Sequence, residues 1–171
     1  MTKKKGGVMD RRRKISIGAA AGVVWAFAVL AGAALFVTLP VFALMPTIMT
    51  AFLAPGLVMI AMVATLGNRR FLNEEIIDGG PLSGAAEIDR RVLVNTTEQL
   101  VLAMAVWPAA AVLLGPEGPG VILVLGVAFA VARLAFWAGY HMAPPLRAFG
   151  FAATFYPTVL VALWALWRVV V

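Results

Sequence analysis

Residues 91–114 read RVLVNTTEQLVLAMAVWPAAAVLL, a polar start followed by a long apolar run. Arg91, Asn95 and Glu98 follow spacings of four and three, so a helix would place their side chains on one face. Apart from these polar residues, the segment is apolar enough to cross a bilayer, where a charged side chain costs about 2.5–3.5 kcal/mol. The stretch therefore predicts a transmembrane helix whose polar stripe needs partners from other helices.

The composition of the whole chain predicts an all-α integral membrane protein. Of 171 residues, 63% are hydrophobic and 13% are charged, and the mean hydropathy is +0.96, which is outside the range of soluble globular proteins. Apolar runs of roughly twenty residues are typical of transmembrane helices rather than of barrel strands. The sequence contains no cysteine, which excludes a disulfide framework and a cysteine nucleophile. Any sulfur nucleophile must therefore arrive with a substrate.

Five apolar runs predict five membrane spans, at about residues 15–39, 47–66, 91–114, 120–142 and 146–170. A basic tail, residues 1–14, precedes the first span. Because this span is too long for a signal peptide, it predicts a retained signal anchor. Pro55 and Gly56 interrupt the second span and predict a kink in it.

The distribution of basic residues predicts the orientation of the chain. With five spans, twelve of the 14 Lys and Arg residues lie on the side of the N-terminus, whereas Arg168 lies on the other side and Arg133 lies inside the fourth span. Lys and Arg concentrate on the cytoplasmic side of membrane proteins. The N-terminus is therefore expected in the cytoplasm and the C-terminus on the opposite side. Membrane orientation also explains the net charge of +6 without a nucleic-acid partner.

A second polar constellation lies at the end of the fourth span. Arg133, Phe136 and Tyr140 follow spacings of three and four, and Arg147 comes at the start of the fifth span. Because the third and fourth spans run antiparallel, this constellation and the polar stripe of the third span are expected at similar depth.

Two interpretations of these polar residues remain open. A salt bridge between Glu98 and Arg133 would only hold the helices together. Such a pair leaves four further residues unexplained: Arg91, Asn95, Tyr140 and Arg147. A small anionic ligand accounts for them together, because guanidinium groups bind carboxylates through paired hydrogen bonds.

The spacings resemble those of the MAPEG family, membrane-associated proteins in eicosanoid and glutathione metabolism. The pattern of the third span, Arg91-x-x-x-Asn95-x-x-Glu98, resembles the signature of the family's second helix. The later pattern resembles the family's third and fourth helices: Arg133-x-x-Phe136-x-x-Gly139-Tyr140, followed by Pro-Leu-Arg147-x-x-Gly150-Phe. The pair Arg69-Arg70 is similar to the basic pair that ends the family's first helix.

The resemblance covers about residues 47–171 and implies a four-helix MAPEG-like membrane domain. Residues 15–46 would add an extra N-terminal transmembrane segment to it. Family members of this kind assemble as trimers and bind glutathione between neighbouring subunits near the cytoplasmic face. The resemblance therefore implies a homotrimer in the lipid bilayer, with glutathione as co-substrate.

The resemblance also implies roles for individual residues. Arg147 would be catalytic and would stabilise the glutathione thiolate. The substrate-binding residues would be Arg91, Asn95, Glu98, Arg133, Phe136 and Tyr140. A free thiol with a pKa of about 8.5 is mostly protonated at neutral pH, and a nearby cation favours the reactive anion.

Two activities follow from the resemblance, together with one alternative. The enzyme would resemble a microsomal glutathione transferase or peroxidase, acting on a lipophilic electrophile or a lipid hydroperoxide that enters laterally from the lipid. Phe136 stands where the best-known glutathione-conjugating members usually carry a tyrosine, so one hydroxyl group is missing. This departure favours the alternative, a non-catalytic trimer that binds or presents a lipid, since the family includes a non-enzymatic member.

Overall fold

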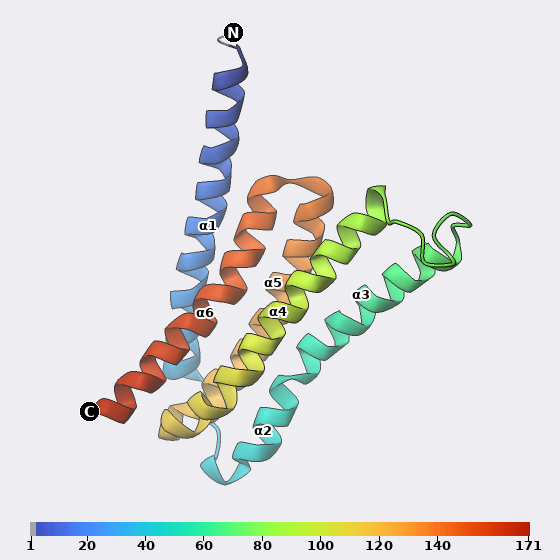
Figure 1. The fold of residues 1–171 in the computed structure, drawn as a ribbon. Coiled ribbons are helices and arrows are strands. Elements are labelled where there is room, and N and C mark those ends of the chain that lie inside the picture. The colour runs from blue at the N-terminus through green and yellow to red at the C-terminus, as the bar shows by residue number, and fades with distance from the viewer. Residues whose placement is uncertain (1–2) are drawn as a thin grey trace.

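The computed structural model describes residues 3–171, and every regular element within them is a helix (Figure 1). In chain order the elements are α1 (Lys3–Phe36), the short 3₁₀ helix η1 (Val41–Ala43), α2 (Leu44–Ala51), α3 (Leu53–Phe71), α4 (Gly84–Leu113), the 3₁₀ helix η2 (Gly115–Glu117), α5 (Gly118–Met142) and α6 (Pro144–Val170). The predicted all-α fold is confirmed.

Five helical segments of the described chain are long and apolar enough to cross a membrane, which confirms the five predicted spans. They are Met9–Phe36, Val41–Phe71, Gly84–Leu113, Gly115–Met142 and Pro144–Val170. The third segment begins at Gly84 rather than near Arg91, so the polar residues before Arg91 belong to the same helix.

The second span is interrupted between α2 and α3. The break falls at Phe52, one turn before Pro55. Proline has no backbone N–H and its ring crowds the carbonyl four residues earlier, which here belongs to Ala51. The next residue, Gly56, resumes the helical pattern and donates its N–H to the Phe52 carbonyl over 3.0 Å.

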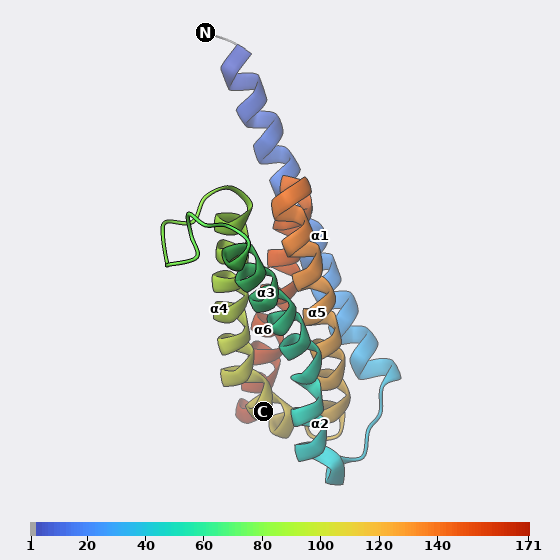
Figure 2. The ribbon, with the colours of Figure 1, turned by 90° about the vertical axis from the view of Figure 1, so that its right-hand side faces the viewer.

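The helices form an elongated bundle in which α5 is the most deeply buried element (Figures 1 and 2). α3 and α4 lie on one side of it, and α1 and α6 lie on the other (Figure 1). The N-terminus, the loop between α3 and α4, and the turn between α5 and α6 lie at one end, which is called here the N-terminal end of the bundle (Figure 1). The C-terminus lies at the opposite end.

Trp107 forms the centre of the main core. Its ring stacks on Phe52 at a centroid distance of 5.4 Å and meets Phe129 edge-on at 5.9 Å. Its Nε1 donates to the Thr158 hydroxyl over 3.3 Å, so the one polar atom of the ring is paired. This core lies toward the C-terminal end of α4 and leaves the other half of the bundle for polar residues.

α1 packs along α6 with small residues at the contact. A Cβ atom added to Gly18 would lie 2.1 Å from the Pro145 carbonyl oxygen, and one added to Gly22 would lie 2.4 Å from the Ala152 Cβ. Only glycine permits such an approach, which resembles the close helix packing of small residues in membranes. α1 is therefore an integral part of the bundle.

Candidate functional site

Arg133 is completely buried and joins three helices through its guanidinium group. Its Nη1 donates to Asn95 Oδ1 of α4 over 3.0 Å. Its Nη2 donates to the Gly150 carbonyl of α6 over 3.1 Å and to the Thr154 hydroxyl. The Phe136 ring centroid lies 4.4 Å from the guanidinium carbon. Within residues 3–171, Arg133 Nε has no hydrogen-bond partner.

The glycines of α5 and α6 bring Arg147 against Tyr140. A Cβ atom at Gly139 would lie 2.2 Å from the Arg147 backbone nitrogen, and one at Gly150 would lie 2.5 Å from the Phe136 nitrogen. This approach places the Arg147 guanidinium carbon 4.9 Å from the centroid of the Tyr140 ring. The Arg147 guanidinium and the Tyr140 phenol therefore lie next to each other at the N-terminal end of the bundle.

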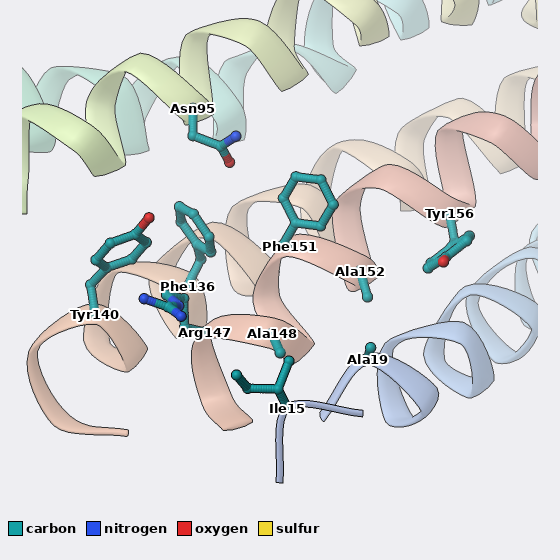
Figure 3. A pocket seen from close by; sticks show the side chains of 10 residues that line it. All are labelled: Ile15, Ala19, Asn95, Phe136, Tyr140, Arg147, Ala148, Phe151, Ala152 and Tyr156. Carbon is teal, nitrogen blue, oxygen red and sulfur yellow. The ribbon is translucent and has the colours of Figure 1, made fainter. Parts of the chain in front are cut away.

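A cavity of about 500 Å³ lies beside these residues and is lined by four helices (Figure 3). Its lining residues are Ile15, Ala19, Asn95, Phe136, Tyr140, Arg147, Ala148, Phe151, Ala152 and Tyr156. The volume is within the range of roughly 300–1,000 Å³ that is usual for small-molecule sites. A few polar groups in an otherwise apolar lining are the arrangement that orients a ligand and stabilises an anion.

The polar stripe of α4 is divided between the cavity and the surface of the bundle. Asn95 lines the cavity, whereas Arg91 and Glu98 are exposed. The Arg91 Nε donates to Glu87 Oε1 over 2.7 Å, and the Asn95 Nδ2 donates to Glu98 Oε2 over 3.1 Å. Arg91 and Glu98 therefore lie next to the cavity on the same helix without lining it.

The simpler interpretation, a salt bridge between Glu98 and Arg133, is wrong for this chain. The ion pairs among residues 3–171 do not include that pair. Arg133 uses the neutral amide of Asn95 instead, and Asn95 in turn contacts Glu98. Four of the seven predicted site residues line the cavity, namely Asn95, Phe136, Tyr140 and Arg147.

A second polar cluster, centred on Asp89, was not found from the sequence. Asp89 is 2% exposed and accepts hydrogen bonds from Arg69 Nε of α3 and from Trp137 Nε1 of α5, the latter over 2.8 Å. The His141 Nε2 lies 2.8 Å from the same carboxylate. This carboxylate joins three helices at the N-terminal end of the bundle.

A signal for Asp89 is present in the sequence. Asp89 precedes Val92, Thr96 and Gln99 at helical spacing, and all four side chains are buried on one face of α4. A carboxylate on the inner face of a helix needs donors from neighbouring helices. A third span that begins at residue 91, as the sequence predicts, places Asp89 outside the transmembrane helix, whereas α4 begins at Gly84 and includes it.

Comparison with known proteins places most of the chain in one family model. The model of the MAPEG family matches residues 27–167, from the last third of α1 to the last turn of α6. No curated protein and no solved structure matches the chain. Since the matched region begins inside α1, the assignment of residues 15–46 as an addition to a domain of residues 47–171 stays a prediction.

Proposed function

The chain belongs to the MAPEG family, and on this premise we propose that it is a glutathione-dependent membrane enzyme. It transfers the sulfur of glutathione to a lipophilic electrophile, or reduces lipid hydroperoxides with glutathione. The observation that carries the proposal is the position of Arg147 over the Tyr140 ring at the edge of a cavity that Asn95 also lines.

Arg147 stabilises the glutathione thiolate. A guanidinium beside a thiol in a partly desolvated cavity favours the anion, and the anion is the nucleophile. Arg147 lies in the first turn of α6, which starts at Pro144, so the helix N-terminus adds to the same effect. Tyr140 and Asn95 supply the neutral hydrogen-bonding groups that orient the peptide.

The two reactions use the same thiolate. In the transfer, a sulfur electron pair forms the new carbon–sulfur bond, the leaving group departs with its bonding electrons, and the thiol proton goes to water. In the reduction, two glutathione molecules supply two electrons and become a disulfide, while the oxygen–oxygen bond of the hydroperoxide breaks to give an alcohol and water.

The exposed charges of α4 support a contact with a neighbouring protomer, and membership of the MAPEG family supports a homotrimer. A carboxylate such as Glu98 is costly at membrane depth unless another group covers it. A neighbouring protomer that packs on this face brings Arg91 and Glu98 into a shared site, where Glu98 binds the ammonium group of glutathione. In this arrangement the N-terminal end of the bundle, which carries Arg69, Arg147 and the basic tail, faces the cytoplasm.

Turnover with two acceptors tests the proposal. Purified protein in detergent or lipid is supplied with glutathione and either a generic aromatic electrophile or a lipid hydroperoxide. Glutathione-dependent turnover of at least one acceptor is expected, with a loss of about a hundredfold or more in Arg147→Ala, as for the removal of one electrostatic donor. Absence of turnover with both acceptors in correctly folded protein would contradict the proposal.

Phe136 favours a second candidate, a non-catalytic trimer that binds or presents a lipid. Its ring is 3% exposed and contacts both the Arg133 guanidinium and the Tyr140 ring, at a centroid distance of 5.0 Å for the latter. It therefore acts in packing and offers the cavity no hydroxyl group. Lipid binding without turnover in the same assay would favour this candidate.

A further inference from the structure

The cavity has a polar end and an apolar side. Tyr140 and Arg147 lie together at one end, and Asn95 projects into the cavity from α4 (Figure 3). On the side opposite Asn95, the lining consists of Ile15 and Ala19 of α1 (Figure 3). Helix α1 thus supplies apolar lining to the cavity that Asn95, Tyr140 and Arg147 also line.

Close contacts with the backbone of α6 hold α1 in this position. Gly18, which lies between Ile15 and Ala19 in the sequence, abuts the carbonyl group of Pro145, and Gly22 abuts α6 one turn later. These contacts leave no room for a hydrocarbon chain between α1 and α6 at the two glycines. An acceptor therefore cannot enter from the lipid between α1 and α6 at these glycines. Inside the cavity it contacts α1, whose position is fixed.

We propose that α1 lines the part of the active site that binds the lipophilic acceptor. Ile15 and Ala19 then limit the size of the acceptor that can react. This inference rests on the proposed function, because it assigns the apolar side of the same cavity. Glutathione occupies the end with Tyr140 and Arg147, and the apolar part of the acceptor lies against Ile15 and Ala19.

Several lining residues beside α1 have small side chains. Ala19 of α1 faces Ala148 and Ala152 of α6 in the lining, and the three methyl groups leave space that a longer side chain would fill. A difference of one methylene group in an apolar pocket changes the discrimination between two substrates by about 10–200-fold. A single enlargement at position 19 is therefore enough to change the range of acceptors.

Kinetics with a graded set of acceptors tests this assignment. The acceptors are aromatic electrophiles that carry alkyl chains of increasing length. Ala19→Leu is expected to lower kcat/KM for the longest acceptor by about tenfold or more relative to kcat/KM for the unsubstituted electrophile. Ile15→Ala is expected to shift the range toward bulkier acceptors.

Ala21→Leu is the matched control, because Ala21 is exposed on the far face of the same helix. It is expected to leave all acceptors unchanged. An equal loss for every acceptor in Ala19→Leu, or the same change in Ala21→Leu, would overturn the inference and leave the proposed function intact.

Labelling of single introduced cysteines tests the position of Ala19 in the cavity without relying on turnover. The label is specific because the chain contains no cysteine of its own. Ala19→Cys should react with a charged, water-soluble thiol reagent several times faster than Ala21→Cys, and an S-alkyl glutathione conjugate should protect it. A conjugate that binds the protein without protecting Ala19→Cys would overturn the inference. If the conjugate does not bind at all, the proposed function fails, and an unreactive alkylbenzene replaces it as the protecting ligand.

Discussion

Arg133 donates from Nη1 to Asn95 Oδ1 over 3.0 Å, and this bond fixes the amide of Asn95 at the edge of the cavity. With its oxygen turned to Arg133, the amide presents its nitrogen to Glu98. Arg133 is itself buried behind the cavity and does not line it. It therefore holds the Asn95 side chain in place and does not itself reach the cavity.

Asn95→Leu tests the link between α4 and α5. The substitution removes one acceptor of the buried Arg133 guanidinium, so the free energy of unfolding should fall by about 1–3 kcal/mol. Denaturant unfolding in detergent micelles measures the change. Val94→Leu, at an exposed neighbouring position, is the control and should be neutral. An equal stability of both variants would contradict the role of the bond.

Asp89→Ala tests the second polar cluster. Arg69, Trp137 and His141 would lose their shared acceptor, and the unfolding free energy should fall by about 1.5–3 kcal/mol, the range for hydrogen bonds to a charged group. Thermal unfolding compared with Asp78→Ala in the exposed loop measures the effect. If the two variants unfold at the same temperature, the cluster does not join the helices.

Gly22→Leu tests the docking of α1 on α6. The added side chain overlaps the Ala152 Cβ and the α6 backbone, so overpacking should cost about 1–3 kcal/mol or release α1. Gly32→Leu is a matched control on the same helix, because nothing lies within 4 Å of an added Cβ there. The unfolding midpoint should fall only in the first variant. A fall of the same size in both would indicate an effect of helix chemistry rather than of packing.

Phe136→Tyr tests the missing hydroxyl group. The ring lines the cavity, so a para hydroxyl at this position can donate to a bound peptide. Glutathione affinity measured by calorimetry should rise about 5–10-fold, which corresponds to one additional hydrogen bond of about 1–1.4 kcal/mol. Phe27→Tyr, on the exposed face of α1, should leave the affinity unchanged. A weaker affinity in Phe136→Tyr would mean that the ring is needed only for packing against Arg133.

The spans and part of the site were predictable because they depend on local patterns. Long apolar runs define the helices, and the spacing of Phe136 and Tyr140 places these two cavity-lining side chains on one face of α5. Two prolines at the start of α6 precede Arg147 in the sequence. They predict that Arg147 lies in the first turn of this helix, beside the end of α5.

The hydrogen-bond partner of Arg133 and the position of α1 depend on contacts between helices, which the spacing of residues within one helix does not predict. The partner of Arg133 is decided by the relative rotation of α4 and α5, which selected the amide of Asn95 over the carboxylate of Glu98. The role of α1 depends on the register in which Gly18 and Gly22 meet α6. The small residues indicate close packing, but they do not identify the helix that they approach.

The ultraviolet absorption of the glutathione thiolate measures whether Arg147 stabilises this anion, as the proposed function requires. Protein mixed with glutathione at neutral pH should develop the thiolate band, and Arg147→Ala should lose it while its unfolding midpoint stays unchanged, since Arg147 is only half-buried. A thiolate band of the same intensity in Arg147→Ala would contradict the account.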